Sequence, residues 1–178
     1  MRFQTIKDSK LEPVSTDEVK AHLRIDGEDL MLNLYRTAAR QQAENYTGRA
    51  FLTKTIAIYN DTVPRDKITL WNTPVKKIVK FKYRDESGKV QSLQDKDYLI
   101  QGSAPEYLIP TSGQFPAGTD LRIEAVCGGV SRESVPSAIK AAILLTIGTL
   151  YENREETVKR LPTSARNLLE PYRIWQFF

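Results

Sequence analysis

Apolar residues recur with the period of an α-helix between about Asp26 and Thr47. The residues that share one broad apolar face are Leu30, Met31, Leu34, Tyr35, Ala38, Ala39, Ala43 and Tyr46. Four polar residues fall on the opposite face: Asn33, Arg36, Arg40 and Glu44. We therefore predict an amphipathic helix that packs on the core through its apolar face, with Asp26 as its N-cap and Gly48 at its C-terminal end.

A shorter helix is predicted before the long one. Ser15 and Glu18 have the spacing of a capping box, in which each side chain accepts a hydrogen bond from the other residue's backbone N–H. The helix that they open should run to about Leu23, with Val19, His22 and Leu23 on its apolar side.

From Phe51 to about Val130 the apolar pattern changes to a period of two, and β-branched and aromatic residues become frequent. The segments that we expect to form strands are Phe51–Tyr59, Lys67–Trp71, Val75–Arg84, Lys89–Leu93, Tyr98–Ile100 and Leu121–Cys127. Asp85 to Gly88 has the composition of a hairpin loop between two of them. The middle of the chain should thus be a small antiparallel sheet.

Beyond the sheet, Pro136 fits the first position of a second long helix. From Ala138 to Tyr151 this helix is apolar almost all the way round, so it should need cover on two sides. Ser164 to Leu169 can add a last helical turn or two. The tail from Pro171 to Phe178 is aromatic, whereas free termini are usually polar, and we expect it to dock on another surface.

Together these elements predict an α+β fold in a single domain spanning residues 1–178. Its helical core should come from residues 13–49 and 134–172, with the β region 50–130 inserted between them and the aromatic tail 171–178 at the end.

Composition places the chain among soluble globular proteins, with 40% hydrophobic residues, 27% charged residues and a net charge of only +4. The single cysteine cannot form an internal disulfide, which fits a reducing compartment. The N-terminus has no apolar core of signal-peptide length, and the run from Val135 to Tyr151, which contains Lys140, is too short to span a bilayer. We expect no membrane contact and synthesis in a cytoplasm.

Candidates for catalysis are few. His22 is the only histidine and lies on a short helix, and Cys127 lies at the end of a strand without a histidine near it in sequence. We interpret both as structural residues, although a small hydrolase built around either one is an alternative. Gly128 and Gly129 lack the lysine and the spacing of a phosphate-binding loop. No catalytic, cofactor-binding or metal site is predicted.

The segment Val75–Arg84 contains several regularly spaced basic residues. Strand alternation in Val75–Arg84 would put the apolar residues on one face. The basic residues expected together on the other face are Lys76, Lys80, Lys82 and Arg84. Such a row could follow a phosphate backbone, which makes a phage or plasmid nucleic-acid-binding module an alternative function. The simpler interpretation is a solvated strand whose lysines prevent edge-to-edge aggregation.

Two separated segments carry a recognisable pattern. The first runs from Pro13 to Asp26 (PVSTDEVKAHLRID) and continues with Ala38-Ala39-Arg40 and with ENYTGR from Glu44. The second is VPSAIKAAILL from Val135, followed by LYENRE from Leu150 and LLEPYR from Leu168. In this order and spacing they resemble the head-tail connector, or adaptor, proteins of tailed bacteriophages and prophages. The resemblance covers about half of the chain.

The resemblance implies a non-enzymatic protein of the virion neck, made in the cytoplasm of a bacterial host. Such proteins form a ring, usually dodecameric, beneath the portal protein. A tail-completion or stopper protein binds to the ring, and double-stranded DNA passes through it. The helix that is apolar on two sides fits a ring, because each copy supplies cover to its neighbour. Residues expected at the oligomer or portal interface are Tyr46, Leu145, Tyr151, Tyr172, Trp175, Phe177 and Phe178.

Overall fold

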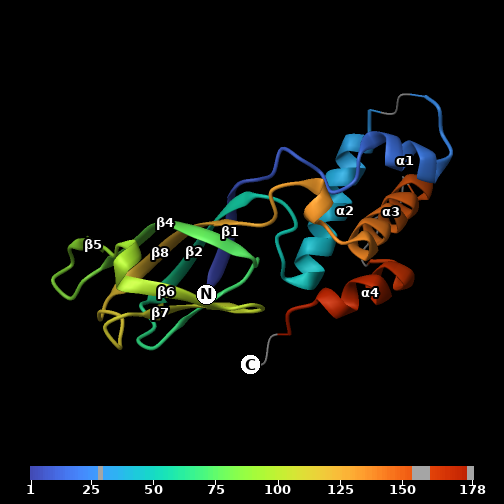
Figure 1. The fold of residues 1–178 in the computed structure, drawn as a ribbon. Helices are drawn as coiled ribbons and strands as arrows, with labels where there is room; N and C mark the ends of the chain where they lie inside the picture. Colours follow the sequence, from blue (N-terminus) through green and yellow to red (C-terminus); the bar gives the residue numbers. More distant parts are fainter. Residues whose placement is uncertain (28–29, 154–160, 176–178) are drawn as a thin grey trace. The chain divides into compact units, whose positions relative to one another are not determined.

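The computed structural model of the protein describes residues 1–27, 30–153 and 161–175. The chain forms two compact units, each assembled from segments that are far apart in the sequence (Figure 1). The β unit comprises Met1–Ser9 and Thr53–Gly128, and the helical unit comprises Lys10–Leu52 and Gly129–Phe178. The predicted α+β fold class is confirmed. The single domain stays a prediction. Within the described ranges, no helix is long and apolar enough to cross a membrane.

Two antiparallel sheets make up the β unit. The larger has five strands in the order β1 (Arg2–Lys7), β2 (Lys54–Thr62), β8 (Thr119–Cys127), β4 (Val75–Arg84) and β5 (Val90–Ser92). The smaller has the order β3 (Ile68–Leu70), β7 (Glu106–Pro110) and β6 (Tyr98–Gly102). The bounds predicted for β4 are confirmed, and so is the loop of residues 85–88 that joins β4 to β5. Strands β1 and β7 were not predicted.

One row of paired residues forms the inner face of the larger sheet. Phe3 pairs with Ile58, Ile58 with Ile123, and Ile123 with Phe81. The ring of Phe81 stacks on Tyr98 of β6 at 5.8 Å between ring centroids, and it lies 5.5 Å from Phe115. The smaller sheet and the Phe115 loop therefore cover this face, and apolar burial holds the β unit together.

Four α-helices form the helical unit: α1 (Thr16–Leu23), α2 (Leu32–Thr47), α3 (Ser137–Glu152) and α4 (Thr163–Leu169). The predicted capping box of Ser15 and Glu18 is present at the start of α1. Helix α3 packs against α1, α2 and α4 (Figure 1), which confirms that this apolar helix needs cover on more than one side. Ile139, Ile143 and Ile147 of α3 are buried in the shared core.

The prediction for α2 was correct at its end and wrong at its start. Gly48 terminates the helix in the left-handed conformation, with φ of 70°. The helix begins at Leu32 with Met31 as its N-cap, and no side chain caps it, so Asp26 lies outside the helix. Because the turn before Leu32 is not part of α2, Leu30 does not reach the core.

The predicted orientation of α2 is only partly right: Tyr35, Ala39 and Ala43 are buried as expected, but the helix is rotated relative to the prediction. Leu30, Met31 and Leu34 are 92%, 43% and 57% exposed. Arg36, Arg40 and Glu44, which were expected to face solvent, are all buried. The helix thus turns part of its apolar side outward and part of its charged side inward.

Ion pairs and hydrogen bonds explain why these charges are inside. The guanidinium of Arg40 binds the carboxylates of Glu12 at 2.8 Å and of Glu44 at 2.9 Å. The second carboxylate oxygen of Glu44 accepts a hydrogen bond from the backbone N–H of Phe51. Arg36 donates two hydrogen bonds to the carbonyl oxygen of Val14. The segment before α1 therefore lies along α2 and supplies acceptors, without which buried charges would be unstable.

Replacing Arg40 with alanine should lower the free energy of unfolding by about 3–5 kcal/mol, because the carboxylates of Glu12 and Glu44 would lose the cation that compensates them. Urea denaturation followed by circular dichroism measures the change. Asn45→Ala, on the exposed side of the same helix, is the matched control and should change stability by less than about 0.5 kcal/mol. Equal effects of the two substitutions would contradict a central role for the buried cation.

Candidate functional site

The two residues considered for catalysis lie in different units. His22 is exposed on α1 in the helical unit, and Cys127 is fully buried at the end of β8 in the β unit. Burial raises the pKa of the Cys127 thiol to about 12, so the reactive thiolate is scarce at neutral pH. No group of three or more His, Cys, Asp or Glu side chains able to hold a metal occurs in the described part of the chain.

The two glycines after Cys127 have packing roles. Gly128 has φ of 91°, a conformation that side chains disfavour, and its N–H donates to the carbonyl oxygen of Pro74. The N–H of Gly129 donates to the carbonyl oxygen of Phe51, and a Cβ at this position would come within 2.3 Å of the Ser134 hydroxyl oxygen. Both amides are engaged within the protein, so this turn does not offer them to a phosphate group.

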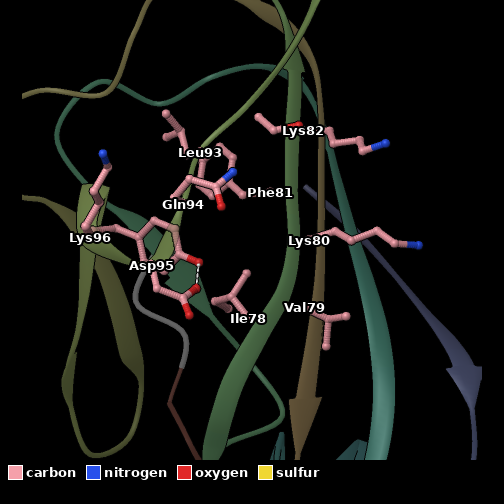
Figure 2. Close-up of a pocket in the computed structure, with 11 residues that line it drawn as sticks. Ile78, Val79, Lys80, Phe81, Lys82, Leu93, Gln94, Asp95 and Lys96 are labelled. Carbon is pink, nitrogen blue, oxygen red and sulfur yellow. Dashed lines mark hydrogen bonds between the residues drawn. The ribbon is translucent and has the colours of Figure 1, made fainter.

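A groove of about 560 Å³ runs beside β4 where its pairing with β5 ends (Figure 2). Ile78, Phe81 and Leu93 contribute its apolar lining. At its side the hydroxyl of Tyr98 donates a hydrogen bond of 2.8 Å to Asp95. Burial, with help from this carboxylate, raises the pKa of Tyr98 above its usual value. A neutral phenol held by one carboxylate is a structural pair and supplies no activated nucleophile.

The alternation predicted for β4 is wrong in its middle. The pairing of β4 with β8 shifts register between Val75 and Lys77 and again between Ile78 and Lys80. Each shift is a bulge that adds a residue and resets which side chains face inward. Ile78 is consequently buried and Val79 is 49% exposed. Figure 2 shows Val79, Lys80 and Lys82 pointing away from the groove side of the strand.

The four predicted basic residues of β4 have different surroundings. Lys80 and Lys82 lie together on the outer face of the larger sheet, the face opposite Phe81. Arg84 is tied to the carboxylate of Asp120 at 3.0 Å and also donates to the carbonyl oxygen of Gly88, so it supports the hairpin. Lys76 falls in a bulge and donates to the hydroxyl of Thr53 at 3.4 Å.

Glu124 is the acidic centre of this outer face. Its buried carboxylate binds Lys80 at 3.0 Å and Arg122 at 2.7 Å. Burial by itself would raise the pKa of Glu124, but the hydrogen bonds and charges of Lys80 and Arg122 outweigh burial and hold that pKa below its usual value. Glu124 therefore stays ionised at neutral pH and fixes the two cations in place.

The structure gives several predicted interface residues partners within the helical unit. Tyr46 donates a hydrogen bond to the carboxylate of Glu170, and the guanidinium of Arg173 lies 5.1 Å from its ring centroid. Tyr151 meets Tyr35 edge to face at 6.5 Å. Leu145 and Tyr172 are partly buried against the core, whereas Trp175 is 53% exposed and Phe177 and Phe178 lie outside the described residues.

The start of the aromatic tail docks on the end of α2. The N–H of Ile174 donates to the carbonyl oxygen of Thr47, and Arg49 donates to the carbonyl oxygen of Tyr172 at 2.6 Å. Ile174 is buried, with its side chain 3.6 Å from the position that a Cβ on Gly48 would occupy. This contact leaves the ring of Trp175 at the surface, stacked on the guanidinium of Arg173 at 4.4 Å.

Sequence reasoning missed the exposed apolar surface at the start of α2. Leu30, Met31 and Leu34 lie within about one helical turn, and each leaves a large side chain in contact with solvent. The apolar periodicity of the sequence assigns all three residues to the core. The residue that could have indicated this rotation is Glu12, just before Pro13. Its carboxylate forms an ion pair with Arg40, which allows the charged side of α2 to be buried.

The fold is similar to that of solved structures of gene transfer agent particles. The virion of a native particle contains a chain that matches with a TM-score of 0.83 and 20% identity. The neck of an empty particle computed with C6 symmetry matches at 0.81 and 19%, and the neck of a native particle computed with C12 symmetry at 0.79 and 20%. Each match covers 100% of this chain and 98% of the other. No family model and no curated protein matched the sequence.

A thiol-reactive dye should distinguish a structural Cys127 from a reactive one. At about pH 8 the native protein should react far more slowly than an unfolded thiol, because its pKa near 12 leaves little thiolate and burial blocks access. The same protein in denaturant should react at the rate of a free thiol. Rapid labelling of the native protein would indicate an accessible, activated cysteine.

Proposed function

We propose that this chain is a structural protein of the neck of a phage-like particle, where it serves as the head-tail connector, or adaptor. The observation that carries the proposal is the similarity of its fold, over 100% of its length, to chains from gene transfer agent necks. The sequence segments that resemble phage connectors are a separate observation from the similarity in fold, and they favour the same role. We infer a non-enzymatic function, in which the protein acts through the surfaces that it offers to partners.

The connector that we propose is a closed ring of identical copies beneath the portal protein. C12 symmetry in one of the similar neck structures favours a ring of twelve. In such a ring every copy uses two different surfaces, each in contact with one neighbour. The exposed side chains of Leu30, Met31 and Leu34 are suited to one of these contacts, because burial of a large apolar side chain is worth about 1.5–3 kcal/mol.

We assign the second interface of the ring, or its contact with the portal, to the seven interface residues predicted from the sequence, which are aromatic except for Leu145. Trp175 is exposed and its ring lies against the guanidinium of Arg173, an arrangement that suits an anchor residue in a protein interface. The residues proposed for this surface remain Tyr46, Leu145, Tyr151, Tyr172, Trp175, Phe177 and Phe178.

In the particle, the ring would complete the DNA-filled head and give the tail its attachment site. We propose that one side binds the portal protein and the other binds a tail-completion or stopper protein, with double-stranded DNA passing through the centre. The site of action is then the virion neck, and the bacterial cytoplasm is where assembly takes place.

Electron microscopy of the purified protein, alone and mixed with portal rings from the same particle, tests this function. We expect closed rings, formed either by the protein itself or on the portal. Leu34→Arg should abolish them, because a charge would be placed in the apolar contact between copies. Asn45→Arg introduces the same charge at another exposed position of α2 and should leave the rings intact.

Circular dichroism should show that both variants are folded, since both positions are exposed. A wild-type protein that stays a compact monomer and ignores portal rings would contradict the proposed function. Rings that form equally well with Leu34→Arg would remove the start of α2 from the interface.

A further inference from the structure

We propose that the outer face of the five-stranded sheet binds the phosphate backbone of double-stranded DNA. This inference goes beyond the connector role and concerns the β unit alone. Strand register determines which side chains lie together on this face.

Three rows of paired residues run across β1, β2, β8 and β4. Directly paired residues point to the same side of a sheet, so each row is a line of neighbouring side chains. The first row is Arg2, Tyr59, Arg122 and Lys82. The second row is Gln4, Ala57, Glu124 and Lys80. The third row is Lys7, Thr55, Val126 and Lys77.

The charge of the three rows is strongly unbalanced. They contain six cations, Arg2, Lys7, Lys77, Lys80, Lys82 and Arg122, and a single carboxylate, Glu124. All six cations are exposed. These three rows thus carry an excess of five positive charges, in a chain whose net charge is only +4. Neighbouring strands are about 4.8 Å apart, so the cations are dense enough to meet consecutive phosphates.

Protection of a sheet edge does not explain the central cations. Arg122 lies on β8, which has β2 and β4 on its two sides. Lys82 lies where β4 is paired with both β8 and β5. Basic side chains deter aggregation on edge strands, but these two positions have no open edge. A polyanionic ligand accounts for their charge.

Tyr59 indicates which part of the DNA is contacted. The guanidinium of Arg2 lies 5.0 Å from the centroid of the Tyr59 ring, and that of Arg122 lies 5.7 Å from it. Single-strand-binding surfaces use open aromatic rings to stack on bases. The ring of Tyr59 is instead occupied by its two arginines and holds them in place. The face is therefore built to contact phosphates, and its binding should be independent of base sequence.

Glu124 does not cancel this face. It orients Lys80 and Arg122 through contacts at 3.0 and 2.7 Å, while an arginine has five N–H donors and a lysine three, so both retain donors for phosphate oxygens. Lys7, Lys77 and Lys82 extend the surface around this centre. The surface is thus complementary in charge to a phosphate backbone, and Glu124 holds two of its cations, Lys80 and Arg122, in fixed positions.

Fluorescence anisotropy with the full-length protein and a labelled duplex of about 30 base pairs tests the proposal over a range of salt concentrations. The wild-type protein should bind two duplexes of unrelated sequence with equal affinity. The double variant Lys77→Glu, Lys82→Glu should bind at least about tenfold more weakly, and the slope of log affinity against log salt should become shallower by about two.

The matched control is Lys67→Glu with Lys96→Glu. It causes the same change in net charge on exposed residues of the β unit that lie outside the three rows, so affinity should fall by less than about threefold. An equal loss in the control would show that net charge alone is responsible and would overturn the proposal. The proposal would also be overturned if the wild-type protein did not bind DNA at about 50 mM salt, or if its binding did not weaken as salt is raised.

A single-stranded oligonucleotide provides the third arm. A clear preference for the single strand, or for one base sequence, would overturn contact with the duplex backbone. Ring formation is measured on the same variants by electron microscopy, and both double variants should still assemble. A variant that loses DNA binding but still forms rings would therefore test the basic face alone. A wild-type protein that forms no rings would instead contradict the connector role.

Discussion

The helical unit depends on a buried cation. Arg40 lies between the carboxylates of Glu12 and Glu44, and this cluster fixes the rotation of α2 about its axis. An isolated charge in a protein core is strongly unfavourable, so α2 can adopt this rotation only with the segment before α1 laid along it. As a consequence, Leu34 on the other side of the helix is left exposed to solvent. The core of one copy thereby creates a surface that a second copy can cover.

The β unit uses register in a comparable way. Pairing across four strands gathers apolar side chains such as Ile123 on the inner face and basic ones such as Arg122 on the outer face. Two of the three register shifts in the pairing of β4 with β8 keep this separation despite a sequence that does not alternate regularly. The helical unit thus offers an apolar surface suited to protein partners, and the β unit offers a basic surface suited to phosphates. Both properties fit the proposed role as a structural protein of the particle neck.

Much of the fold could be predicted because local signals determine it. The capping box at Ser15, the left-handed Gly48 and the bounds of β4 all follow from a few neighbouring residues. The errors arose where the local structure depends on contacts with residues that are far away in the sequence. Nothing near Arg40 in the sequence shows that Glu12 will neutralise it, and β1 has too little apolar character to be recognised without its partner β2. The basic face was only partly predicted, because Arg2 and Arg122 join Lys82 through strand pairing alone.

The most direct test of this account is a cryo-electron microscopy reconstruction of the assembled ring at side-chain resolution. The account predicts that the first turn of α2 packs against the neighbouring copy and that Leu34 is buried there, while the contacts of Arg40 with Glu12 and Glu44 remain within each copy. A ring in which Leu34 still faces solvent in every copy would contradict the central claim that the buried cluster turns this surface toward a neighbour.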